Sequence, residues 1–181
     1  MPFFKRFALS ALIIMLTAVS AGCSFKADGA RTIEEISGTY SLMEFYETKE
    51  DAETDLLDTF DYFYMVVGER SSVTVVYKDA DSEEHFTKTV HYTCNYESGS
   101  TEMVTELKLR FDMPNSTLDG GVVVNYLTVK DEKLVCQKIG YIPSSSSSMP
   151  ATMHIVFMSF TQVSEDATLA YVEGKTGLDL E

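Results

Sequence analysis

Three kinds of side chain in this sequence have the chemistry for metal binding or catalysis: histidines, closely spaced carboxylates and serines. His85 and His91 lie six residues apart in one β-rich run. At ~3.3 Å per residue they are about 20 Å apart, too far to share a metal ion. His154 lies in a different run. The sequence therefore predicts three polar surface histidines and no metal site.

The carboxylates Asp79, Asp81 and Glu83 alternate as calcium ligands do. An EF-hand loop needs Gly at its sixth position and Glu at its twelfth, and these positions hold Glu84 and Val90. We expect a solvated acidic turn here, and a solvated face for the eight carboxylates of residues 44–61. The sequence contains no Gly-x-Ser-x-Gly elbow and no Gly-rich phosphate loop. It predicts a protein that is not an enzyme and holds no cofactor.

One cysteine, Cys23, follows an apolar N-terminal run. Lys5 and Arg6 precede an uncharged stretch, residues 7–19, and the small residues 20–22 follow it. The stretch is shorter than the ~20 residues that cross a bilayer, and its layout is that of a secretory signal peptide. The alternatives are a buried N-terminal helix, or ordinary secretion with a chance cysteine at this place.

Residues 20–23, small residues followed by Cys23, resemble the lipobox of bacterial lipoproteins. The resemblance implies that residues 1–22 are a signal peptide and that the Cys23 thiol carries lipid chains such as palmitate. The protein would then be extracytoplasmic and lipid-anchored in the cell membrane or outer membrane. Residues 23–36 are predicted to be the lipidated cysteine and a polar tether, and residues 37–181 one domain. The net charge of −14 argues against nucleic-acid binding.

The domain is predicted to be all-β. Eight β-rich runs are separated by turn residues: 38–47, 61–67, 73–78, 85–96, 101–113, 122–130, 134–142 and 151–163. Short links favour an antiparallel, up-and-down β-barrel of about eight strands, with a two-sheet sandwich as the alternative. The acidic segment 48–61 is not expected to be a strand and is predicted to be a short helix or packed loop. Residues 164–174 predict a C-terminal helix between Ser164 and Gly174, with a ninth strand as the alternative.

Two runs alternate clearly enough to assign an inner face, which is the candidate lining of a ligand cavity or simply a packed core. Its members are Phe86, Val90, Tyr92, Met103, Leu107, Leu109 and Phe111. Cys94 shares the face of run 85–96, and Cys136 lies on run 134–142. Two strands would separate these cysteines by roughly 14 Å, so we expect two reduced, buried thiols.

The order of these elements, and Gly38-Thr39-Tyr40 in the first run, resemble the lipocalin-like fold and its Gly-x-Trp motif. The resemblance implies a barrel that binds a small apolar ligand. We expect a membrane-anchored, non-catalytic lipoprotein of this kind. The alternative is a protein–protein module, an inhibitor, immunity or envelope assembly factor, acting through segments 48–61 and 143–150.

Overall fold

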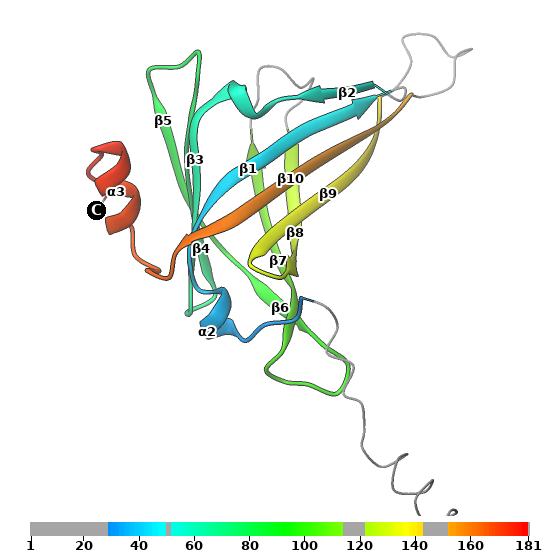
Figure 1. Cartoon of the computed structure of the whole chain (residues 1–181), viewed down its shortest axis with the longest axis vertical. Coiled ribbons are helices and arrows are strands. Elements are labelled where there is room, and N and C mark those ends of the chain that lie inside the picture. Colours follow the sequence, from blue (N-terminus) through cyan, green and yellow to red (C-terminus); the bar gives the residue numbers. More distant parts are fainter. Residues whose placement is uncertain (1–28, 50–51, 114–121, 143–151, 181) are drawn as a thin grey trace, which may run out of the picture.

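The computed structural model describes residues 29–49, 52–113, 122–142 and 152–180 (Figure 1). Cys23 and the segment 143–150 lie outside these residues. The described elements are α2 (Ile33–Ile36), β1 (Gly38–Lys49), β2 (Ala52–Asp55), the 3₁₀ helix η1 (Leu57–Thr59), β3 (Phe60–Gly68), β4 (Ser72–Asp79), β5 (His85–His91), β6 (Thr93–Tyr96), β7 (Val104–Met113), β8 (Val122–Lys130), β9 (Lys133–Ile142), β10 (Thr152–Ser164) and α3 (Ala170–Thr176).

All the described strands belong to one antiparallel sheet in the order β5-β4-β3-β1-β10-β9-β8-β7-β6, with β2 added to β1. The two end strands, β5 and β6, are consecutive in the chain, and only Tyr92 lies between them. The sheet therefore curls on itself as a half-barrel whose strands follow chain order around it (Figure 1). The predicted all-β, up-and-down class is confirmed, and the continuous sheet replaces the two-sheet alternative.

The predicted strand 85–96 is divided at Tyr92 because the chain changes partners there. β5 pairs with β4, whereas β6 pairs with β7. The Tyr92 amide donates to the Ser71 carbonyl at 3.0 Å, and its hydroxyl donates to the Gly68 carbonyl at 2.9 Å. Tyr92 thus fixes the β3–β4 turn to the point where the sheet meets itself.

The prediction that segment 48–61 contains no strand is wrong, because β2 lies within it. β1 pairs with β3 only over Gly38–Ser41, so its later half has an edge that β3 does not use. β2 pairs with that edge, from Tyr46↔Asp55 to Lys49↔Ala52. The predicted short helix is confirmed as η1.

The inner face of the sheet forms one apolar core. β7 alternates buried and exposed residues from Leu107 to Met113, as predicted. The start of β7 differs from the expectation: Val104 is fully buried, and Met103 is half-buried before the strand. The reason is a β-bulge at Thr105, because Asn95 pairs with Glu106 while Tyr96 pairs with Val104. The extra residue returns Val104 to the inner face.

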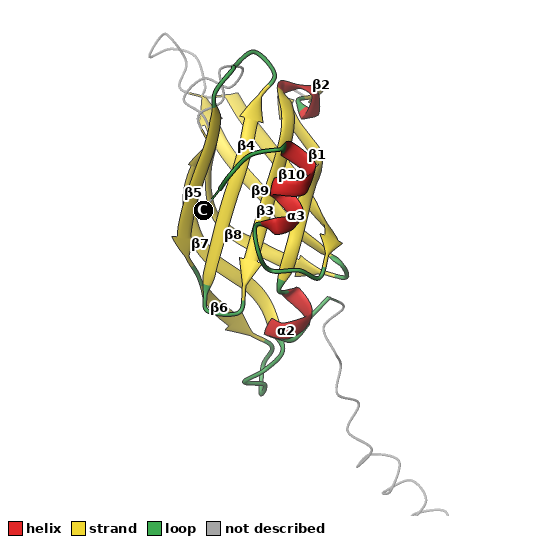
Figure 2. Cartoon of the chain, turned by 90° about the vertical axis from the view of Figure 1, so that its left-hand side faces the viewer, coloured by secondary structure: helices red, strands yellow, loops and turns green. Residues whose placement is uncertain are grey.

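The C-terminal segment is helical, which excludes the ninth strand, but its helix begins later than predicted. Ser164 Oγ accepts from the Asp166 amide at 3.0 Å, and Asp166 Oδ1 accepts from the Thr168 amide at 2.9 Å. These bonds hold a turn ahead of α3. Gly177, not Gly174, ends the helix, in the left-handed conformation at φ 72°. Helix α3 covers the outer face of β3 and β4, where Val172 packs with Val66 and Val76 (Figure 2).

Residues 31–36, predicted to be part of the tether, contact the barrel. The backbone groups of Arg31 and Val104 exchange two hydrogen bonds, at 3.1 and 2.7 Å. Thr32 and Glu35 form a capping box at the start of α2. Ile36 is fully buried. Helix α2 therefore packs over one end of the barrel.

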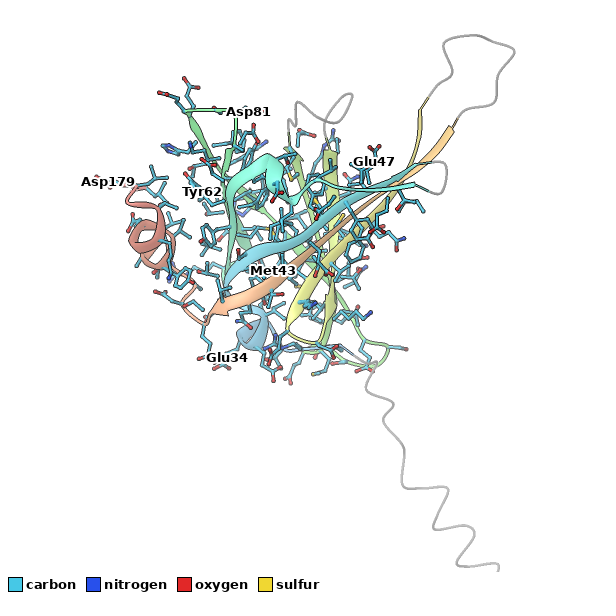
Figure 3. The ribbon with its side chains drawn as sticks, turned by 45° about the horizontal axis from the view of Figure 1, so that its top comes forward. Glu34, Met43, Glu47, Tyr62, Asp81 and Asp179 are labelled. Atoms are coloured by element: carbon cyan, nitrogen blue, oxygen red, sulfur yellow. The ribbon has the colours of Figure 1, made fainter. Side chains whose placement is uncertain are left out.

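The two ends of the barrel are named here by their elements. The α2 end comprises α2 and the turns β3–β4 and β8–β9. The β4–β5 end comprises η1, the last residues of β4 and the turn 80–84. Glu34 and Asp81 mark these opposite ends in Figure 3.

Candidate functional site

The predicted lining residues divide into three groups in the structure. Tyr92, Leu107, Leu109 and Phe111 are buried in the core. Phe86 and Val90 are half-buried and pack against it. Met103 is half-buried ahead of β7, and its carbonyl accepts from the Glu97 amide at 2.8 Å. The inner face thus brings together six of the seven residues and leaves Met103 apart.

Aromatic rings from β3, β4 and β5 gather inside the β4–β5 end. The Tyr77 ring lies 5.1 Å from that of Phe63, 5.6 Å from that of Phe60 and 4.8 Å from that of Phe86, centroid to centroid. Both Phe60 and Phe63 face inward because a bulge lies between them, where Phe60 pairs with Asp79 but Tyr62 pairs with Lys78. We name these four rings the aromatic cluster.

Two oxygen atoms beside the aromatic cluster are buried without a hydrogen-bond partner in the structure: Tyr77 Oη and Asp79 Oδ1. Tyr77 is 2% exposed, and Asp79 follows it two residues later on the same face of β4. Burial, reinforced by the Asp79 charge, raises the pKa of Tyr77 to about 12. Burial, reinforced by Asp81, also raises the pKa of Asp79. The expectation of a solvated turn is therefore wrong for one oxygen of its first carboxylate, whereas Asp81 and Glu83 are exposed as predicted.

A lateral pocket of about 220 Å³ opens beside the aromatic cluster, where β1 separates from β3. Phe60 and Phe63 line both this pocket and the cluster. Asp58 of η1 and Asp61 of β3 also line the pocket. Both carboxylates are exposed, and Asp61 forms an ion pair with Lys78. The pocket thus joins an acidic rim to apolar walls.

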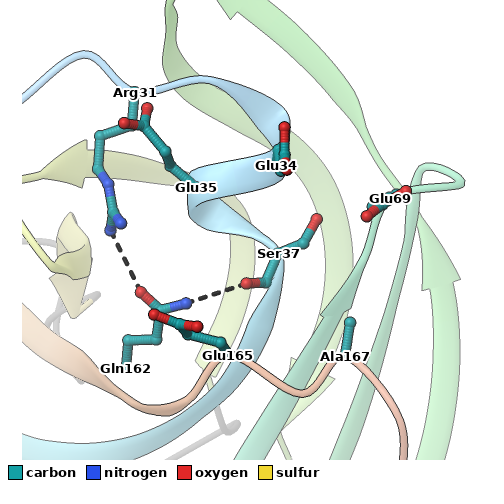
Figure 4. Close-up of a pocket in the computed structure, with 8 residues that line it drawn as sticks. All are labelled: Arg31, Glu34, Glu35, Ser37, Glu69, Gln162, Glu165 and Ala167. Carbon is teal, nitrogen blue, oxygen red and sulfur yellow. Dashed lines mark hydrogen bonds between the residues drawn. The ribbon is translucent and has the colours of Figure 1, made fainter.

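A second pocket, of about 430 Å³, lies at the α2 end between α2, the β3–β4 turn and the segment after β10 (Figure 4). The Arg31 guanidinium donates to Gln162 Oε1 at 3.3 Å, and Gln162 Nε2 donates to the Ser37 carbonyl at 2.9 Å. The pocket is rimmed by the carboxylates Glu34, Glu35, Glu69 and Glu165. Its basic group is already engaged in this chain of hydrogen bonds.

The histidines and carboxylates do not assemble a metal site in the described part of the chain. His85 and His91 are exposed on β5, and His91 Nδ1 lies 3.3 Å from the Ser71 carbonyl oxygen. The side chain of His154 lies outside what the structure describes. The predicted surface position is confirmed for His85 and His91.

Cys94 and Cys136 are not joined by a disulfide, and strands β7 and β8 lie between them, as predicted. Cys136 is buried, and Cys94 is half-buried. Burial raises the pKa of the Cys94 thiol, which a hydrogen bond with Tyr96 partly offsets. Both thiols belong to the inner face rather than to a reactive surface site.

Sequence reasoning did not name Tyr77, Phe60 or Phe63 as site residues, and it considered Asp79 only as part of a calcium-like acidic turn. The available signal was the alternation Val73, Val75, Tyr77, which puts a tyrosine hydroxyl on an otherwise apolar face. A buried tyrosine normally finds a hydrogen-bond partner, so its position alone gives no warning that this hydroxyl has none.

Comparison with known proteins returned no matching family model, curated protein or solved structure. Among the described residues, no helix combines the length and hydropathy needed to cross a membrane.

Proposed function

We propose that this chain is a membrane-anchored, extracytoplasmic lipoprotein whose barrel domain binds a small apolar ligand and catalyses no reaction. The observation that carries the binding function is the aromatic cluster with the unpartnered Tyr77 Oη. Ligand sites are usually apolar and contain a few convergent polar groups. The inner face of β4 supplies both, since Val73, Val75 and Tyr77 share it with Asp79.

The anchor is proposed from the lipobox resemblance of residues 20–23. Arg31 is held to β7 at the α2 end by two backbone hydrogen bonds. The eight residue-to-residue steps from Cys23 to Arg31 reach at most about 28 Å, at ~3.5 Å per step. Lipidation of Cys23 would therefore hold the α2 end close to the membrane and direct the β4–β5 end away from it. The anchoring membrane is the cell membrane or the outer membrane.

The anchor is tested by Cys23→Ser in the full chain, expressed in bacteria fed radiolabelled palmitate. The wild type should incorporate label and sediment with membranes. The variant should lose the label and leave the membrane fraction. Cys94→Ser is the matched control, because it removes a thiol from the inner face of the barrel. Equal labelling of wild type and Cys23→Ser would refute lipidation at this residue.

Ligand binding is tested by native mass spectrometry of the full chain purified from its own host in mild detergent. A retained small molecule, displaced by a saturating apolar fluorophore, is the expected result. A bare protein mass together with unsaturable fluorophore binding would count against a ligand-binding barrel.

A protein–protein module is the second candidate, and strand β2 favours it. β2 pairs with β1 alone among the described strands, so its other edge offers backbone groups to a partner strand. Glu53 and Asp55 on this strand are exposed. An envelope protein captured by the wild type but not by a Glu53→Gln, Asp55→Asn double variant would support this function. Equal capture by both would exclude this edge.

A further inference from the structure

Two buried oxygen atoms at the β4–β5 end have no hydrogen-bond partner in the described structure. Tyr77 Oη can donate one hydrogen bond and accept others, whereas an ionised Asp79 Oδ1 can only accept. Neither has a partner, and the Tyr77 side chain is 98% buried, at 2% exposure. Buried polar atoms in native proteins are nearly always paired, so this pair of atoms calls for an occupant.

The nearest cations do not meet this need. Lys78, on the outer face of β4, is paired with Asp61. Lys88 faces inward on β5, opposite Val75, but is exposed and forms no ion pair with Asp79. The donor missing at Asp79 is therefore not provided by these neighbouring side chains.

The surroundings of these atoms define the rest of the occupant. The rings of Phe60, Phe63 and Phe86 pack around Tyr77 within 5.6 Å, centroid to centroid. Such faces favour an apolar body and attract a cation placed over them. Asp58 adds a carboxylate at the lateral pocket, whose walls include Phe60 and Phe63.

We infer that the β4–β5 end binds an organic ammonium compound, with its apolar body in the lateral pocket against Phe60 and Phe63 and its N–H groups donating to Tyr77 Oη and Asp79 Oδ1. This inference rests on the proposed ligand-binding function and names its ligand class. A carboxylate ligand would face the charge of Asp79. The net charge of −14 also favours the approach of a cation over that of an anion.

The test is calorimetric titration of the full chain in mild detergent, at pH 7 and 0.15 M salt, with three compounds of similar size and aromatic body. These are 2-phenylethylammonium, neutral 2-phenylethanol and anionic 3-phenylpropionate. The ammonium compound should bind at least about tenfold more tightly than the other two, because hydrogen bonds to charged groups are stronger than those between neutral groups. Equal or tighter binding of the anion would overturn the inference.

Two variants locate the binding energy. Asp79→Asn and Tyr77→Phe should each weaken ammonium binding about tenfold and change phenylethanol binding less. Asp112→Asn is the control for net charge, because Asp112 is exposed on the outer face of β7. Tyr126→Phe is the control for the hydroxyl, because Tyr126 is exposed on β8 and its hydroxyl donates to the Gln137 carbonyl. Equal losses in a variant and its control would overturn the assignment.

The outcomes separate this inference from the proposed function. Saturable phenylethanol or fluorophore binding with no preference for the ammonium compound would leave the ligand-binding barrel standing and overturn the inference. If none of the three compounds binds, the inference is overturned, and the native mass spectrum with the fluorophore titration then decides the ligand-binding function. Circular dichroism of each variant confirms that a loss of binding is not a loss of fold.

Discussion

The two ends of the barrel differ in whether their buried tyrosine hydroxyls have hydrogen-bond partners. At the α2 end, the Tyr40 hydroxyl donates to the Ile36 carbonyl at 2.9 Å, and the Thr39 hydroxyl donates to the Asp166 carbonyl at 2.8 Å. At the β4–β5 end, Tyr77 is equally buried, yet its hydroxyl has no partner. Burial raises the pKa of both tyrosines to about 12, so both hydroxyls stay protonated at neutral pH.

This contrast separates an end whose buried hydroxyls are paired from an end with unused hydrogen-bonding capacity. A buried hydroxyl without a partner costs about 1–3 kcal/mol, whereas a paired one is close to neutral or favourable. Proteins depart from consistent local chemistry chiefly at functional sites. The difference between Tyr40 and Tyr77 therefore directs attention to the β4–β5 end, although the larger surface pocket lies at the α2 end.

The largest predicted effect is at the α2 end. Ile36→Ala should reduce the free energy of unfolding by about 2–5 kcal/mol, because Ile36 is fully buried and holds α2 on the barrel. Phe86→Ala, at the other end, should reduce the free energy of unfolding by less than the same substitution of a fully buried phenylalanine, since Phe86 is half-buried. Urea unfolding followed by circular dichroism measures both. A larger loss in Phe86→Ala than in Ile36→Ala would reverse the assigned roles of the two ends.

The next prediction compares the two tyrosines directly. Tyr40→Phe should reduce the free energy of unfolding by about 1–3 kcal/mol, because the Ile36 carbonyl loses its donor. Tyr77→Phe should leave stability unchanged or raise it by about 1 kcal/mol, because it removes a hydroxyl that has no partner. The same urea titrations, without ligand, provide the measurement. Losses of equal size would mean that Tyr77 Oη has a partner after all.

The strands were largely predictable because alternation and turn residues are local signals. Residues 122–130 were predicted as a strand and form β8 with the same bounds. β2 was not predictable, because Ala52–Asp55 is acidic and takes its conformation from an edge of β1 that β3 leaves unpaired. The bulge at Thr105 likewise depends on pairing with β6, and it exchanged the predicted places of Met103 and Val104.

The candidate site was less predictable than the fold. Alternation placed Leu107 and Phe111 inside correctly, since it reports which face a residue occupies. It does not report whether a buried hydroxyl reaches a partner. That depends on side chains from the neighbouring strands β3 and β5, whose positions the alternation within β4 does not report. For the same reason, the sequence predicted a fully solvated acidic turn, although Asp79 Oδ1 is buried in the structure.

The smallest predicted effect is the pH dependence of Asp79. Burial raises its pKa above the ordinary value of 3.8, so the folded protein binds this proton more tightly than the unfolded chain. By proton linkage, the ionised Asp79 carboxylate lowers the free energy of unfolding once the pH exceeds the raised pKa. Well below pH 3.8, Asp79 is protonated in both the folded and the unfolded state and has no effect on stability. Asp79→Asn cannot ionise and avoids this loss.

Urea unfolding of the wild type and of Asp79→Asn, at intervals from pH 3 to pH 7, measures this effect. The two proteins should be closest in stability at pH 3. The variant should gain on the wild type as the pH rises through the window above 3.8, and the advantage should then become constant. A saturating organic ammonium compound should reduce or reverse this advantage, because it gives Asp79 Oδ1 a donor in the wild type alone. A difference that stays the same from pH 3 to pH 7 would contradict the burial of this carboxylate, and with it the contrast between the two ends.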